Sequence, residues 1–213
     1  VAIIKLFTGL NLAPAQLSGE LQRAGHESRI IYFKDYQDHT LEESKNYQVP
    51  DMSGMLFSVD GRQVIWTCYT PFTPRDFDLL NEELKSFRPD VIGFSLYSGI
   101  IKETALVTKE LRKHFDVPII WGGAGPTLQP ELCIDHADIL CINEGEEVLV
   151  ELANRIDAKL PWDDIDGTWA RAADGTIIKN KKRPNIPLDD IAIPDWNLSH
   201  YTHINDERKV RCR

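Results

Sequence analysis

The chain has 213 residues, 42% of them hydrophobic, which is enough for the core of one large α/β domain or of a smaller domain with an appendage. Its net charge is −9, and the short basic run at residues 179–183 stands alone, which argues against nucleic acid as the principal partner. No apolar run approaches the roughly 18 residues of a membrane span. The four cysteines show no CxxC spacing, which argues against a zinc or iron–sulfur site and favours a reducing, cytoplasmic compartment.

The first part of the chain predicts a strand, a helix and a second strand. Residues 1–7 are a nearly continuous apolar run, typical of a buried strand, and residues 8–11 follow as a loop. Helical spacing then links four apolar positions, Leu12, Leu17, Leu21 and Ala24. Gly25 ends this helix, and residues 26–33 form the second strand. His26 follows the helix-ending glycine, so we interpret it as a structural residue at the amino-terminal edge of the sheet.

Residues 34–72 interrupt this alternation and are interpreted as an insertion. Two β-rich runs, residues 55–59 and 62–66, flank Asp60 and Gly61, which predicts a hairpin with a type I′ turn. A connection that follows a strand leaves from the strand's carboxyl end, where ligands bind in α/β sheets, so we expect the insertion to overhang the binding side. It would contribute there to the site, or it would be a decoration or a contact with another domain.

Three further strands and their helices follow. Thr73 and Pro74 mark a capped helix start, and residues 77–87 continue at helical spacing. Strands are predicted at residues 91–95, 117–121 and 137–142. The intervening and following helices are predicted over residues 100–111, over a short stretch at 127–134, and after residue 146.

Five strands that alternate with helices predict a parallel sheet with helices on both faces. Right-handed crossovers favour the flavodoxin-like, Rossmann-like order 2-1-3-4-5, whose switch point lies between the first and third strands. A ligand at this point would touch the loops after strands one, three, four and five. These loops are residues 8–12, 95–99, 122–127 and 143–146, and all are small, polar or rich in glycine.

The loop after the fourth strand has the most distinctive sequence. The apolar residues 119–121 pass directly into the run Gly-Gly-Ala-Gly-Pro at 122–126. Glycines remove the Cβ atoms that would block a bulky ligand or forbid a positive φ angle. An ordinary turn would use the same residues, but the small and polar residues of the three neighbouring loops favour a ligand.

We predict no catalytic residue and no metal ligand in this chain. Neither Ser95 nor Ser98 has the GxSxG surroundings of a hydrolase nucleophile, and the Walker A and GxGxxG fingerprints are absent after the first strand. The acidic residues 144–147 either complement the dipole of the helix that they begin or form a polar wall of the ligand cleft. Asp135, His136 and Asp138 lie at the entrance to the fifth strand and are interpreted as a surface cluster.

The character of the sequence changes near Pro161. Residues 168–171 and 176–179 flank an Asp-Gly pair at 174–175, which predicts a second hairpin. A proline-spaced arm over residues 184–196 follows, and we expect Trp196 to anchor it on a surface. We therefore divide the chain into a domain over residues 1–160 and a hairpin with a linker strap over 161–213 that leads to another domain. The chain starts on Val1 inside a strand-like run and ends on Arg213 without a stop signal, so we expect a piece of a longer protein.

Several of these motifs together resemble the N-terminal cobalamin (B12)-binding domain of B12-dependent radical SAM enzymes. The matching segments are residues 89–95, 120–127, 130–131 and 143–146, and residues 165–171 and 191–196 are similar to the family's hairpin and linker. The resemblance implies a Rossmann-like domain that carries the corrin ring across the carboxyl edge of the sheet and buries the nucleotide tail near Ser95, Gly122 and Gly123. The cofactor-binding residues that it implies are Thr8, Asn11, Leu12, Ser95, Leu96, Tyr97, Ser98, Gly122, Gly123, Gly125, Pro126, Thr127, Glu144, Gly145 and Glu146.

The resemblance also limits what this chain does alone. The family's partner domain carries a CxxxCxxC motif for a [4Fe–4S] cluster and S-adenosylmethionine, and this sequence has no such motif. The DxHxxG motif that supplies a cobalt-ligating histidine in other cobalamin proteins is absent as well. We therefore expect a module that binds cobalamin without turnover and is linked to the radical SAM domain of a methyltransferase or cyclase. The alternatives are the nucleotide-sugar-binding lobe of a glycosyltransferase and a docking domain of the same family that has lost its cofactor.

Overall fold

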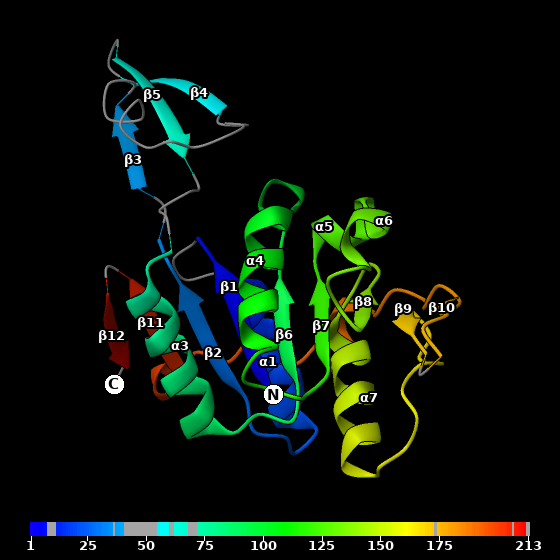
Figure 1. The fold of residues 1–213 in the computed structure, drawn as a ribbon. Helices are drawn as coiled ribbons and strands as arrows, with labels where there is room; N and C mark the ends of the chain where they lie inside the picture. The colour runs from blue at the N-terminus through cyan, green and yellow to red at the C-terminus, as the bar shows by residue number, and fades with distance from the viewer. Residues whose placement is uncertain are drawn as a thin grey trace.

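The computed structural model describes residues 1–7, 12–35, 72–172, 174–205 and 207–211, together with the backbone of three strands at 37–40, 55–59 and 62–67. Figure 1 shows a twisted sheet whose strands run side by side, with α3 (Pro74–Phe87) and α4 (Ile101–Leu111) in front of it. In the described part of the chain, no helix has the length and apolar character needed to cross a membrane.

The centre of the sheet consists of five parallel strands in the order β2-β1-β6-β7-β8. Their bounds are β1 Ala2–Leu6, β2 Arg29–Phe33, β6 Ile92–Ser95, β7 Ile119–Gly122 and β8 Ile139–Cys141. In order along the chain this is 2-1-3-4-5, so the predicted topology is confirmed. The strands are short and apolar because both faces of a parallel sheet are buried.

Side chains alternate along β1 between two separate hydrophobic clusters. Ala2, Ile4 and Leu6 belong to the cluster that includes the buried residues of α3 and α4. Ile3 belongs to the second cluster, with Leu21 of α1 (Leu12–Arg23) and with the buried side of α7 (Glu146–Asp157). The sheet therefore has α3 and α4 on one face and α1 and α7 on the other.

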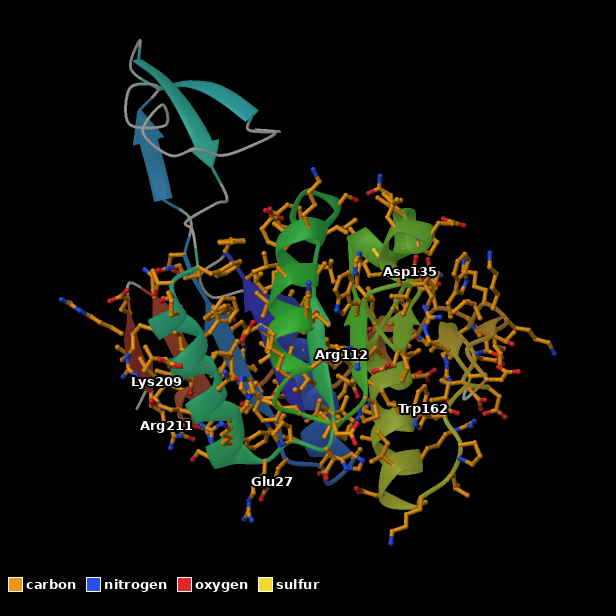
Figure 2. The ribbon with its side chains drawn as sticks, in the orientation of Figure 1. Glu27, Arg112, Asp135, Trp162, Lys209 and Arg211 are labelled. Atoms are coloured by element: carbon orange, nitrogen blue, oxygen red, sulfur yellow. The ribbon has the colours of Figure 1, made fainter. Side chains whose placement is uncertain are left out.

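Four further strands extend the sheet to nine at its two edges. β9 (Thr168–Arg171) and β10 (Ile177–Lys179) are the hairpin predicted around residues 174–175, and β9 pairs antiparallel with β8. At the opposite edge, β11 (Tyr201–Asn205) pairs parallel with β2, and β12 (Arg208–Arg211) pairs antiparallel with β11. Figure 2 shows Lys209 and Arg211 at this edge beside α3, where both side chains reach the buried carboxylate of Glu83. The sequence did not predict β11 and β12.

The strap between β10 and β11 contains two short 3₁₀ turns, η2 (Leu188–Asp190) and η3 (Leu198–His200), and runs along α1. The prediction that Trp196 anchors this strap was wrong. Trp196 is 55% exposed, whereas the neighbouring Asp195 is 7% exposed. The backbone N–H of Asp195 donates to the carbonyl of Ala15 at 2.8 Å, and its carboxylate accepts from the Ser18 hydroxyl at 2.6 Å. Hydrogen bonds to a buried carboxylate, rather than an aromatic contact, hold the strap.

The insertion carries a separate three-stranded antiparallel sheet in the order β3-β5-β4. β4 (Met55–Val59) and β5 (Arg62–Thr67) pair with Val59 opposite Arg62, so the predicted hairpin is present, and β3 (Gln37–Thr40) adds a strand that the sequence did not predict. In Figure 1 this small sheet lies beyond the carboxyl ends of the parallel strands, on the side where the insertion was expected.

The two ends of the insertion are joined by a buried ion pair. The ammonium of Lys34, which follows β2, lies 2.8 Å from the carboxylate of Asp76 in the first turn of α3, and the side chains are 2% and 0% exposed. Asp76 also forms a capping box with Thr73, as the capped helix start predicted. A buried pair of this kind fixes where the insertion leaves the domain and where it returns.

Candidate functional site

A cavity of about 270 Å³ lies under the carboxyl edge of the sheet, on the face covered by α1 and α7. Its floor is formed by residues of four strands, Ile3, Gly93, Ile120 and Cys141, and its walls by Ala13, Leu17 and Leu149 of the two helices. The rim consists of Ser95, Gly122, Gly123 and the loop at residues 143–146. The interior is apolar and the rim is polar, which is the usual character of a site for an organic ligand.

The cavity exists because small residues face it from neighbouring strands. Gly93 lies in the middle of β6, opposite Ile3 of β1 and Ile120 of β7. A Cβ atom at this position would lie 3.5 Å from the Ile120 side chain and would point into the cavity. Glycine within a strand often marks close approach of a ligand, because it leaves the sheet surface open.

The glycine-rich loop after β7 has a different role from the one expected. Gly123 has a φ of +97°, and a Cβ on it would lie 2.6 Å from the carbonyl oxygen of Leu96. A Cβ on Gly125 would lie 3.2 Å from the backbone carbon of Tyr97. The backbones are joined by two hydrogen bonds, from Leu96 N–H to Gly122 and from Gly125 N–H to Leu96. These two glycines therefore make room for the neighbouring loop of the same chain, and Gly122 and Gly123 both line the rim of the cavity.

Thr127 joins the two loops that form the rim. Its hydroxyl donates to the carbonyl oxygen of Gly123 at 2.9 Å and accepts from the backbone N–H of Asn143 at 3.0 Å. Asn143 has a φ of 75°, a conformation that asparagine tolerates better than most residues. Thr127 lies in α5 (Ala124–Leu128), which starts within the glycine run, so the single short helix predicted over residues 127–134 is instead α5 followed by α6 (Pro130–Cys133).

The acidic loop at the rim is divided between the strap and the cavity. The carboxylate of Glu144 accepts from the backbone N–H of Ile186 in the strap at 2.8 Å, and Glu147 pairs with Arg183 at 3.1 Å. Glu146 lines the cavity at the first position of α7. Both interpretations of this loop thus have a counterpart in the structure, since Glu144 is a rim residue and Glu146 lies at a helix start, where a carboxylate is favourable.

The floor of the cavity is uncharged. Burial raises the pKa of the Cys141 thiol to about 12, and the thiol donates to the carbonyl of Glu144 at 3.3 Å. Within the ranges that the structure describes, no three His, Cys, Asp or Glu side chains form a possible metal site. Asp135 and Asp138 pair with Arg171 and Arg112 at the amino end of the strands, away from the cavity.

Comparison with known proteins shows what the chain is similar to. No protein with a curated description matches the sequence. Residues 60–153 match the family model of the B12 binding domain. This segment is similar to a B12-binding domain. It starts between β4 and β5 and ends in α7, so β1, α1 and β2 precede the matched segment.

Solved structures that contain the same fold include two larger enzymes. OxsB, a cobalamin-dependent S-adenosylmethionine radical enzyme solved with aqua-cobalamin and S-adenosylmethionine, matches with a TM-score of 0.65 and 16% identity, over 92% of this chain and 24% of that chain. The radical S-adenosylmethionine methyltransferase TsrM from Kitasatospora setae, solved with cobalamin and a [4Fe–4S] cluster, matches with a TM-score of 0.55 and 15% identity, over 91% of this chain and 31% of that chain. At these identities the likeness establishes the fold, and this chain spans less than a third of either enzyme.

The structure brings part of the expected cofactor-binding set of the B12-binding domain together. Six of the expected residues line the cavity, namely Ser95, Gly122, Gly123, Glu144, Gly145 and Glu146. Gly125, Pro126 and Thr127 lie in α5 behind the rim, Tyr97 directly precedes η1 (Ser98–Ile100), and Ser98 is the first residue of η1. Leu12 is 60% exposed at the start of α1, whereas Leu96 is 2% exposed and packs in the core under α3 and α4. Thr8 and Asn11 lie outside the described residues.

Sequence reasoning did not find the interior of the cavity. The cavity-lining residues that it did not name are Ile3, Ala13, Leu17, Gly93, Phe94, Ile120, Cys141 and Leu149. Most are ordinary apolar residues, whose contribution depends on which face of the sheet they occupy. Gly93 was the available signal, because a glycine within an otherwise β-branched and aromatic strand indicates an open sheet surface.

Proposed function

We propose that this B12-binding domain binds cobalamin, with the corrin ring across the carboxyl edge of the sheet and the nucleotide tail in the cavity beneath it. The observation that supports this most directly is the apolar cavity over Gly93, which opens at the switch point of the sheet between β1 and β6. Ligands of open α/β sheets bind at this point.

The residues present fit the nucleotide tail of this cofactor. A flat aromatic base needs an apolar slot, and Ile3, Ile120 and Leu149 provide apolar walls around the open surface of Gly93. The volume of about 270 Å³ is close to the lower end of ligand pockets, roughly 300–1,000 Å³, which suits one part of a large cofactor rather than the whole. Ser95 and Asn143 at the rim supply hydrogen-bonding groups for the polar link between tail and ring.

No histidine lines the cavity among the residues that the structure describes. The sequence of the loop after β1 contains none either, since residues 8–12 read Thr-Gly-Leu-Asn-Leu. We therefore expect that no histidine from this loop would ligate the cobalt of a bound cobalamin. When bound, the cofactor would supply cobalt-based group-transfer chemistry to a partner domain.

The proposed context is a larger enzyme in which this chain is the cobalamin-binding module. We infer a covalently linked radical SAM domain, with a [4Fe–4S] cluster and S-adenosylmethionine, and a reaction of the methyltransferase or cyclase type. The buried free thiols of Cys133 and Cys141 suit a reducing, cytoplasmic compartment. This module alone would hold the cofactor without turnover.

A binding experiment tests the proposal. The protein is mixed with hydroxocobalamin and desalted, and its visible spectrum is recorded; retained corrin colour supports cobalamin binding and colourless protein contradicts it. Protection by nucleotide-sugars in a thermal shift assay, without corrin colour, would instead favour the glycosyltransferase lobe. Neither response would favour the docking domain without cofactor.

A single substitution locates the binding site. Gly93→Val would place a branched side chain in the cavity, so we expect it to abolish retention of hydroxocobalamin while the domain still folds, as judged by circular dichroism. Ala172→Val introduces the same side chain at a partly exposed position beyond β9 and is the control, with unchanged retention expected. Equal retention by Gly93→Val and wild type would exclude this cavity as the tail site.

A further inference from the structure

Lys5 is a charged residue in a strand that is otherwise apolar. It lies in β1 between Ile4 and Leu6 and is only 8% exposed. Because side chains alternate along a strand, Lys5 leaves β1 on the same face as Ile3, which lines the cavity. The Lys5 ammonium lies 5.7 Å from the centre of the Tyr97 ring.

The sheet register places Lys5 in the row of residues that forms the rim. Ile3 and Ile4 pair with Gly93 and Phe94, so the next residue of β1 lies beside Ser95, and Ser95 pairs in turn with Gly122. Ser95 and Gly122 both line the cavity. Since neighbouring strands are about 4.8 Å apart, Lys5 is one strand away from the rim, on the cavity face.

Among the described residues, no carboxylate forms an ion pair with Lys5. Burial lowers the pKa of Lys5 to about 8, which means that removal from water disfavours the ammonium. Lys34, which is also buried, differs from Lys5 because its ammonium lies 2.8 Å from the carboxylate of Asp76. A buried cation whose described surroundings give it an aromatic ring but no carboxylate is typical of a residue that binds an anionic ligand.

The proposed cofactor presents an anion where Lys5 lies. In cobalamin a phosphodiester joins the corrin ring to the nucleotide base, so with the ring at the edge and the base in the cavity, the phosphodiester must cross the rim. The described residues that line the cavity include two carboxylates, Glu144 and Glu146, and no lysine or arginine. A neighbouring cation is therefore needed to offset their repulsion of an anion.

We propose that Lys5 binds the phosphodiester of the nucleotide loop at the rim of the cavity, an inference that rests on the proposed function. An ammonium is a common partner of phosphate groups in proteins, and a site shielded from water strengthens the pair. The proposal assigns Lys5 a role in selecting complete cobalamin over corrinoids that lack the nucleotide loop.

The test compares two corrinoids and three variants. Dissociation constants for hydroxocobalamin and for aquocobinamide, which lacks the phosphodiester and the base, are measured from visible spectra with wild type, Lys5→Met and Lys5→Arg. Loss of a charge-assisted hydrogen bond should weaken hydroxocobalamin binding about tenfold or more in Lys5→Met and much less in Lys5→Arg. Affinity for aquocobinamide should stay the same in all three. Lys85→Met, an exposed change in α3, is the control and should leave both affinities unchanged.

Each contrary outcome has a distinct meaning. Unchanged hydroxocobalamin affinity in Lys5→Met would overturn the role of Lys5, and so would equal weakening for both corrinoids, because that result indicates a packing defect. A wild-type protein that binds neither corrinoid would contradict the proposed function itself. Circular dichroism verifies that Lys5→Met is folded, and if it is not, Lys5→Gln carries the same comparison.

Discussion

Replacing Lys5 by methionine should stabilise the free domain at pH 7. Burial lowers the pKa of this lysine from 10.5 to about 8, and each pKa unit corresponds to 1.36 kcal/mol. The ammonium therefore destabilises the folded state by about 3 kcal/mol at pH 7 relative to an unburied lysine. Lys5 is only 8% exposed, so solvent screening reduces this figure little. Methionine is similar in length and carries no charge, so the free energy of unfolding should rise by about 2–3 kcal/mol.

The sign of the pH dependence gives a second test of the same variant. Between about pH 8 and pH 10.5 the unfolded chain binds more protons at Lys5 than the folded chain does. The destabilisation is thus complete below pH 8 and disappears as the pH rises through 10.5. Urea unfolding followed by circular dichroism at pH 7 and pH 10 should show a larger difference between Lys5→Met and wild type at pH 7. A variant that is less stable at pH 7, or a difference that does not change with pH, would refute this reasoning.

Three other substitutions test the contacts that position the site. Asp76→Asn leaves the Lys34 ammonium buried without its counter-charge and should lower the free energy of unfolding by about 3–5 kcal/mol in urea melts, whereas the exposed change Asp78→Asn should have little effect. Gly123→Ala should lower it by more than Gly175→Ala, because both glycines have positive φ but only the first would place a Cβ 2.6 Å from a backbone oxygen; equal losses would argue against that contact. Asp195→Ala should accelerate proteolysis within residues 184–196, unlike Asp189→Ala at an exposed position, and unchanged cleavage would argue against the anchor.

The central sheet could be predicted because its signals are local and mutually consistent. Each parallel strand is a short β-branched or aromatic run bounded by turn residues, and right-handed crossovers then leave few arrangements. β11 could not be predicted in this way, since Thr202, His203 and Asn205 give it a largely polar sequence. It forms a strand because the open edge of β2 offers it hydrogen-bond partners, which is a non-local cause.

The strap shows why the chemical type of a residue is a weak guide to its burial. Trp196 is the large apolar residue of this segment and was expected to anchor it, but it is more than half exposed. Asp195 is buried instead because its carboxylate has hydrogen-bond partners. It accepts a hydrogen bond from the Ser18 hydroxyl, and it is hydrogen-bonded to the His200 ring. These partners also lower the pKa of Asp195, against the effect of burial, which raises it. A partner as distant in sequence as Ser18 cannot be inferred from one polar residue in an arm rich in proline.

The candidate site also has a part that the sequence could predict and a part that it could not. Its rim was predictable because the carboxyl ends of parallel strands share one edge, and six expected residues do line the cavity. The interior was not predictable, since it depends on the positions of α1 and α7 relative to the sheet. The glycine run was interpreted as space for a ligand, whereas Gly123 and Gly125 make space for the backbone at Leu96 and Tyr97. A positive φ or a close approach requires glycine in the same way whether the neighbour is a ligand or the protein.

The cavity is lined by residues that precede the insertion in the sequence and by residues that follow it. This division explains why contacts are needed at the two ends of the insertion. Ile3, Ala13 and Leu17 precede residues 34–72, whereas Gly93 and all later lining residues follow them. The site is intact only if β1 and α1 stay in register with β6, so the chain must return to the domain at a fixed point. The Lys34–Asp76 pair fixes that point.

A cluster of aromatic side chains also holds the two ends of the insertion together. Phe33, at the end of β2, stacks on Phe72 with ring centres 5.3 Å apart, and Phe72 also contacts Phe7 at 5.7 Å and Phe77 at 5.5 Å. Such aromatic pairs each add about 0.5–1.5 kcal/mol beyond their burial. With both ends held, the entropy of closing the insertion grows only slowly with its length. The insertion can therefore carry its own sheet beyond the carboxyl edge without altering the register of Ile3, Lys5 and Gly93 on which the proposed site depends.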